Sequence, residues 1–144
     1  MEQLSTGKRI NSAADDAAGL SISTRMTSQI RGLNQAVRNA NDAISLLQTA
    51  EGAQVEVADM LQRMRELAIQ ASSDTNTAQE RSFSNDEYQQ LYSEIDRIAK
   101  NTQFNGMTLL NGLAGSAGTL DFQVGTNSAQ KISVALDNMQ LSTP

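Results

Sequence analysis

Residues 22–71 read ISTRMTSQIRGLNQAVRNANDAISLLQTAEGAQVEVADMLQRMRELAIQA, and this stretch decides the fold. It contains no proline, and its apolar residues recur in steps of three and four, the 3.5-residue period of a coiled-coil seam. The period weakens around Gly52 and then resumes as far as Ala71. We therefore predict one helix over about 14–73, far longer than the ~11–12 residues of an average globular helix. The seam comprises Ile22, Met26, Ile30, Leu33, Val37, Ala40, Ile44 and Leu47.

Composition excludes several classes of function. The 144-residue chain carries a net charge of −5 and has neither cysteine nor histidine. An acidic balance without basic runs argues against binding to nucleic acid. The missing side chains exclude disulfides and thiolate metal sites, and they remove the commonest general base. No apolar run reaches the ~18 residues that a membrane span needs. We therefore expect no enzyme, no cofactor, no metal site and no membrane partner.

The first 16 residues are rich in turn formers and predict an extended lead-in. Within it, Lys8 and Arg9 are interpreted as solvated surface charges. Asp15 and Asp16 suit the start of the long helix, where acidic side chains satisfy free N–H groups and complement the helix dipole. A catalytic or metal-binding pair is the alternative, but adjacent residues on a helix point about 100° apart.

The remaining chain predicts a second helix and a hairpin. The polar residues 72–79 end the long helix, and a second helix follows over about 77–101, antiparallel to the first. Residues 17–104 thus form a helical rod. In residues 105–144, the turn signals Asn105-Gly106 and Asn111-Gly112 precede two alternating stretches, about 120–124 and 131–136. The predicted fold class is mainly α, a long antiparallel helical bundle or coiled-coil rod with a small β-hairpin.

These elements cannot bury all of the apolar surface that the chain carries. A chain of this length normally buries about two-thirds of its unfolded surface, which a helix pair and one hairpin cannot do. We therefore expect part of the stripe to meet helices outside this chain. Gly19, Gly32 and Gly52 lie inside the long helix, where each costs about 1 kcal/mol, tolerable where a neighbour approaches closely. Arg63 is first interpreted as a solvated residue paired with Asp59 or Glu66.

Several motifs, in order and spacing, resemble bacterial flagellin over nearly the whole chain. The resemblance implies the N-terminal part of the core rod domain of a subunit of the extracellular flagellar filament, secreted for motility. It also implies other flagellin subunits, an export chaperone and cap proteins as partners. The terminal inner-tube helices and the C-terminal half of the family are absent, so a fragment is expected. The motifs are RINSAADDAAGLSIS (residues 9–23), GLNQAVRNANDAISLLQTAEGA (32–53), LQRMRELAIQASS (61–73), EIDRIAKNTQFNGMTLLNG (94–112) and FQVG (122–125).

The resemblance assigns roles to particular residues. In flagellins the segment matching residues 61–70, with the following helix, forms the surface that Toll-like receptor 5 recognises, overlapping a subunit interface. The matching residues are Gln62, Arg63, Leu67 and, by ungapped spacing, Glu87. Arg63 would supply a bidentate contact and Leu67 an apolar anchor, the kind of pair that forms a hot spot. The resemblance also implies subunit packing for Lys8, Arg9, Asp15 and Asp16.

Two other functions stay open at this point. The opening GKRINSAADD is shared with hook–filament junction proteins, although residues 16–20 and the QTAEGA segment favour flagellin itself. A monomeric helical binding module is the second alternative.

Overall fold

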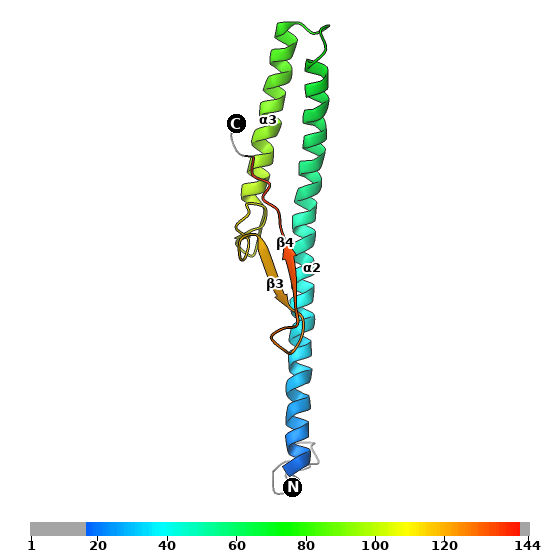
Figure 1. Cartoon of the computed structure of the whole chain (residues 1–144), viewed down its shortest axis with the longest axis vertical. Coiled ribbons are helices and arrows are strands. Elements are labelled where there is room, and N and C mark those ends of the chain that lie inside the picture. Colours follow the sequence, from blue (N-terminus) through cyan, green and yellow to red (C-terminus); the bar gives the residue numbers. More distant parts are fainter. Residues whose placement is uncertain (1–16, 142–144) are drawn as a thin grey trace. The chain divides into compact units, whose positions relative to one another are not determined.

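The computed structural model describes residues 17–141, and these form two helices and two small sheets (Figure 1). Helix α2 spans Ala17–Ala71 (55 residues) and helix α3 spans Ala78–Asn101 (24 residues). The strands are β1 (Gln103–Phe104), β2 (Met107–Thr108), β3 (Thr119–Gln123) and β4 (Lys131–Ala135). The mainly α class, with two long helices packed together and small antiparallel strand pairs, is confirmed. The predicted lead-in, residues 1–16, lies outside the described residues.

The turn between the helices is built from short-range hydrogen bonds. At the end of α2, Ser72 N donates to Ala68 O and Ser73 N to Gln70 O, both at 3.1 Å. Thr77 then caps α3: Glu80 N donates to Thr77 Oγ1 at 3.3 Å, while Thr77 N donates to Glu80 Oε2 at 2.7 Å. This reciprocal capping box satisfies two donors that a helix start would otherwise leave free. The chain therefore reverses direction between Ala71 and Ala78.

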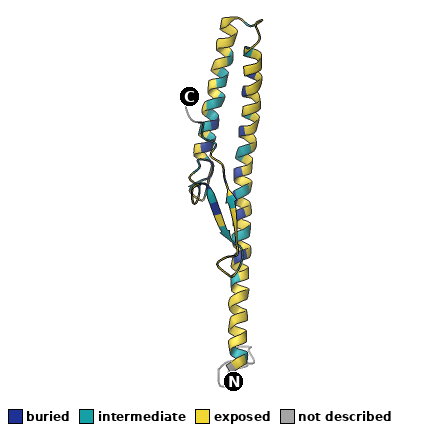
Figure 2. Ribbon diagram, viewed as in Figure 1, coloured by how far each residue is buried: buried dark blue, intermediate teal, exposed yellow. Residues whose placement is uncertain are grey.

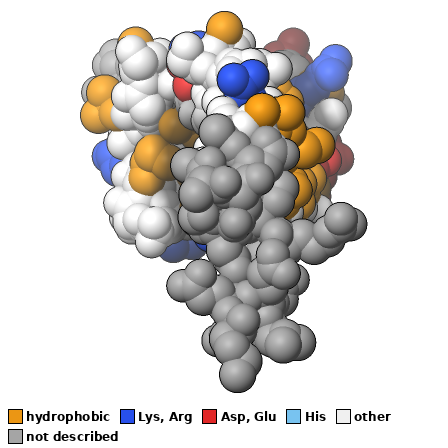
Figure 3. Space-filling view, turned by 90° about the horizontal axis from the view of Figure 1, so that it is seen from below, with side chains coloured by type: hydrophobic (Ala, Val, Ile, Leu, Met, Phe, Trp, Pro, Cys, Tyr) orange, Lys and Arg blue, Asp and Glu red, His pale blue; other side chains and the backbone are white. Residues whose placement is uncertain are grey.

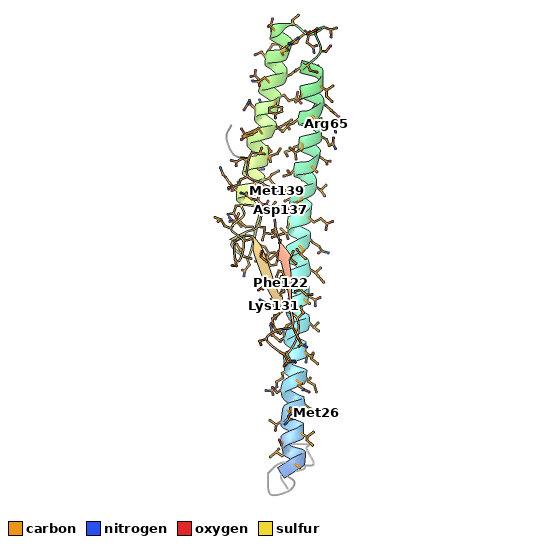
Figure 4. All side chains as sticks on the ribbon, viewed as in Figure 1. Met26, Arg65, Phe122, Lys131, Asp137 and Met139 are labelled. Carbon is orange, nitrogen blue, oxygen red and sulfur yellow. The ribbon has the colours of Figure 1, made fainter. Side chains whose placement is uncertain are left out.

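The chain divides into two compact units. Within the described residues, one combines residues 17–41 with 122–132, and the other combines residues 42–121 with 133–141. In the second unit, α3 runs beside the C-terminal half of α2 in the opposite direction (Figure 1). Val57, Met64 and Ile95 form the centre of its core. Met139 packs against this cluster and is labelled between α3 and α2 in Figure 4.

The same unit carries a compact loop structure after α3. Thr102 ends the helix by donating its N–H to Ile98 O at 2.9 Å. Strands β1 and β2 pair antiparallel around the two-residue turn Asn105-Gly106. The sequence predicted this turn but not the strands. Leu109 and Leu110, which follow, are fully buried.

In the first unit, the loop that joins β3 to β4 packs on α2. Asn39 Nδ2 donates to Gln123 O at 2.9 Å. A Cβ at Gly32 would stand 2.8 Å from Thr126 Cγ2, so this glycine admits the loop. A close neighbour is the condition under which the sequence makes a glycine inside this helix tolerable, and Gly32 meets it. At Gly52, nothing described lies within 4 Å of the Cβ position.

The stripe of α2 that the chain buries is not the predicted seam. The buried residues recur every seven positions and are mostly small, so neighbouring elements can approach the helix closely. The predicted seam lies one residue further along, a rotation of about 100°. Six of its eight members are more than half exposed, and the uncovered surface near the N-terminal end of α2 is visible in Figure 2. The buried stripe comprises Ala36, Ala43, Ala50, Val57 and Met64, with Leu46 and Leu67 beside it.

Candidate interaction surface

The predicted interface residues lie on the two helices of the second unit, and Arg63 is at their centre. Its guanidinium bonds Glu87 Oε1 from Nε and from NH2, both at 2.9 Å, and Glu66 Oε2 from NH1 at 3.1 Å. Glu66 lies one turn further along α2, whereas Glu87 belongs to α3. The structure therefore joins two of the predicted residues, Arg63 and Glu87, into one ion pair across the helices. Of the two partners first considered for Arg63, Glu66 is correct.

The charges in this group are exposed, which limits their effect on stability. The hydrogen bond to Glu87, followed by that to Glu66, raises the pKa of Arg63 above its ordinary value, so the guanidinium stays charged. The side chains of Arg63 and Glu87 are each close to half exposed. Exposed ion pairs contribute little to folding because water and salt screen them. The pair instead fixes a planar, charged group in one position, where it could meet a partner.

Gln62 and Leu67 occupy different environments. Gln62 is exposed beside Arg63 on α2. Leu67 is only 3% exposed, because it packs inward between α2 and α3. The structure thus buries the residue named as an apolar anchor, and its role in an interface stays a prediction. Leu67 lines a pocket of about 200 Å³, together with Ala68, Ala71, Arg81, Ser84, Asn85 and Tyr88.

A line of exposed apolar side chains lies elsewhere on α2. Every residue from 21 to 31 is exposed, and Ile22, Met26 and Ile30 are each 58% exposed. Leu33, Val37 and Ile44 continue this line, which we call the outer stripe (residues 22, 26, 30, 33, 37 and 44). Viewed from below, hydrophobic side chains reach the surface on several sides of the molecule (Figure 3). Contiguous apolar patches are rare on monomeric proteins and mark interaction sites.

The other predicted site residues belong to neither the charged group around Arg63 nor the outer stripe. Lys8, Arg9, Asp15 and Asp16 lie outside the described residues. Within residues 17–141, no group of three or more carboxylates is placed to hold a metal ion. No helix in that range is both long and apolar enough to cross a membrane.

The ion pair with Glu87 could have been found from the sequence. Arg63 precedes Thr75 by twelve residues and Glu87 follows it by twelve. In an antiparallel hairpin that turns at Thr75, these two positions face each other. The exposure of Ile69 and Phe83, both 63%, was not predicted.

These features define a helical protein that leaves an apolar stripe of its longest helix uncovered. The family described as bacterial flagellin N-terminal helical region matches residues 1–114. The chain belongs to the bacterial flagellin family.

Individual relatives agree with this assignment. The chain is 55% identical over 142 residues to a flagellin of Halalkalibacterium halodurans, covering 99% of this chain and 51% of the relative. It is 53% identical over 140 residues to flagellin A of Vibrio cholerae, covering 97% and 36%. The chain thus spans about half, or less, of the length of these relatives.

Two solved structures are similar to the described fold. FliC from Burkholderia pseudomallei matches with a TM-score of 0.61 and 44% identity, over 67% of this chain and 37% of that one. Bacillus cereus flagellin matches with a TM-score of 0.61 and 39% identity, over 69% and 58%.

Proposed function

We propose that this chain is the N-terminal core part of a structural, non-enzymatic subunit of the bacterial flagellar filament, secreted and assembled outside the cell for motility. The observation that carries the proposal is the outer stripe, a line of large apolar side chains that the described chain leaves uncovered. Helices with such a stripe gain stability by packing it against another helix. Family membership supplies the partners: other regions of a flagellin and neighbouring subunits.

The test compares two faces of the same helix in a full-length flagellin that carries this segment. Met26→Gln with Ile30→Gln makes the outer stripe polar, whereas Thr24→Gln with Ser28→Gln changes exposed positions about 160–200° away. All four residues are exposed in the described chain, so when introduced into this 144-residue chain alone both pairs should leave its melting temperature unchanged. Electron microscopy should show filaments for the control pair and none for the stripe pair. Filaments of normal length from the stripe pair would overturn the proposal. An unchanged full-length protein that stays monomeric under polymerising conditions would favour a binding module.

The finer part of the proposal concerns the group Gln62, Arg63 and Glu87. We infer that this exposed, charged group is the part of the surface that Toll-like receptor 5 contacts, and that it overlaps a subunit interface. It is supported by the ion pair that holds the Arg63 guanidinium and by the exposure of Gln62 beside it. Leu67 would contribute through the shape of the pocket above it rather than as an exposed anchor. An export chaperone and cap proteins are the further partners that family membership suggests.

A matched pair of arginines tests the receptor assignment. Arg63→Ala removes the ion-paired guanidinium, and Arg65→Ala removes an exposed arginine two positions along, labelled on α2 in Figure 4. Receptor signalling by soluble protein should fall at least about fivefold for Arg63→Ala, as for a hot-spot truncation of more than about 1 kcal/mol. It should change little for Arg65→Ala. Equal losses in both variants would point to non-specific charge, and unchanged signalling in both would remove this group from the contact.

A further inference from the structure

The chain contains two Asn-Gly dipeptides in different structural settings. They are Asn105-Gly106, between β1 and β2, and Asn111-Gly112, a few residues later. Asparagine followed by glycine is prone to lose ammonia, because glycine offers no side chain to hinder attack by its backbone nitrogen. Local chemistry alone would make the two sites equally reactive. Their surroundings therefore decide which of them reacts.

Asn105 and Gly106 are held loosely. Both are exposed, and nothing lies within 4 Å of the Cβ position at Gly106. Asn105 has a φ of 49° and Gly106 a φ of 79°, the left-handed pair typical of a two-residue hairpin turn. The strands that close this turn have two residues each, so only a short ladder must open for the turn to rearrange. Within residues 17–141 no hydrogen bond holds the Asn105 side chain.

Asn111 and Gly112 are held firmly. The Asn111 side chain accepts a hydrogen bond at Oδ1 from Leu113 N at 2.9 Å, which restricts the rotation of its amide group. A Cβ at Gly112 would stand 2.9 Å from Asn138 Cβ, so the glycine backbone packs directly against the C-terminal segment. The preceding Leu110 is fully buried, and its carbonyl accepts from Met139 N at 2.9 Å. Local opening here must break contacts with the core.

We propose that Asn105 is a site of spontaneous deamidation and that the fold protects Asn111 from the same reaction. The Gly106 nitrogen attacks Asn105 Cγ, a C–N bond forms, and the side-chain nitrogen leaves as ammonia with the proton from Gly106 N–H. Water then adds to either carbonyl of the succinimide and opens it. The products are aspartate or isoaspartate, and both place a new carboxylate at the tip of the β1–β2 turn. No electrons are transferred, and water is the co-reactant.

The test follows both sites in one sample of the unchanged chain. After incubation at neutral to mildly alkaline pH, proteolytic peptides are separated and weighed, since each deamidation replaces an amide by a carboxyl group. Asn105 should react at least about tenfold faster than Asn111 in native buffer, because the two sites differ in the free energy of local opening. In denaturant the two rates should become nearly equal. A native rate at Asn111 equal to or above that at Asn105, or no reaction at Asn105, would overturn the proposal.

A variant separates structure from local sequence. Asn138→Gly removes the side chain that packs on Gly112 and should accelerate deamidation at Asn111 alone. Asn105→Gln should abolish the early product, because the longer side chain would have to close a less favourable six-membered ring. If Asn138→Gly accelerates both sites equally, a general loss of folding is responsible and the assigned protection is wrong. Circular dichroism on the same samples detects such a loss.

Discussion

Two glycines on α2 differ in how closely another part of the chain approaches them. Gly32 admits Thr126 of the β3–β4 loop, whereas Gly52 has only open space at its Cβ position. A glycine inside a helix costs about 1 kcal/mol relative to alanine. Gly52→Ala should therefore raise the free energy of unfolding of this chain by about that amount.

Gly32→Ala is the matched comparison for Gly52→Ala. It gains the same helix propensity but must displace Thr126, so the net stabilisation should be smaller or negative. Thermal unfolding followed by circular dichroism measures both variants. A larger gain for Gly32→Ala than for Gly52→Ala would contradict this account.

The capping box of α3 predicts a dependence on pH. Hydrogen bonds from Thr77, first from its backbone and then from its side chain, lower the pKa of Glu80 below its ordinary 4.5. Because the pKa in the folded chain is lower than in the unfolded chain, this stabilisation is complete above the unfolded-state pKa. It is lost as the pH falls through the folded-state pKa.

Glu80→Gln keeps the cap geometry but cannot titrate. The stability advantage of the unchanged chain over this variant should therefore shrink as the pH is lowered below about 4.5. Urea titrations of both chains at a series of pH values measure it. An advantage that grows on acidification would reverse the assigned sign. Thr77→Ala, which removes the cap itself, should destabilise the chain by about 1 kcal/mol at neutral pH.

At the scale of elements, the contact between α2 and α3 depends on a few buried side chains. Leu67 is 3% exposed, whereas Ile69, two residues further along the same helix, is 63% exposed. Leu67→Ala should destabilise the chain by about 2–5 kcal/mol, because it leaves a cavity in the core. Ile69→Ala should change the stability by less than about 0.5 kcal/mol. Denaturant midpoints with equal slopes test the contrast, and comparable losses would show that α3 does not cover Leu67.

The elements themselves could be predicted because their signals are local. The 3.5-residue period, the polar break after Ala71 and the alternation near Leu120 each act over a few neighbouring residues. The choice between two stripes on α2 could not be made in the same way. The outer stripe has the larger apolar residues, Ile22 to Ile44, so periodicity favours it. The face of α2 that becomes buried is the one on which other parts of the chain can pack closely. Small residues such as Ala43 and Ala50 make this close packing possible.

The candidate site was predictable only in part, for the same reason. The family resemblance named Arg63 and Glu87 separately, and their equal distance from Thr75 in the sequence places them opposite each other once the two helices are taken as an antiparallel hairpin. The resemblance also named Leu67, but it did not predict that this side chain is buried. The sequence carries residue types and spacing. Residues 60–71 have apolar side chains on more than one side of the helix, so packing decides which of them point into the core.

At the scale of the whole molecule, local stability should vary strongly along the described chain. Residues 21–31 are all exposed, while Val57, Met64 and Ile95 form a core. Helix that lacks tertiary packing is marginal in water, and poorly packed segments open at low free energy. Backbone amides of residues 21–31 should therefore exchange hydrogen within seconds to minutes, and those of residues 57–67 should be the slowest. Hydrogen exchange with mass spectrometry measures both ranges, and equal protection would contradict the described burial.

The seven-residue repeat of the buried stripe restricts how α2 can change in length. Inserting one residue before Ala36 rotates the upstream part of the helix by about 100°. The upstream members of the outer stripe, residues 22–33, would then no longer align with Val37 and Ile44. Inserting seven residues restores the alignment to within about 20°. Length variants of this helix should therefore be viable in whole-heptad steps and defective between them. The heptad spacing therefore determines which longer or shorter forms of α2 could replace the present helix without changing the direction of its apolar stripe.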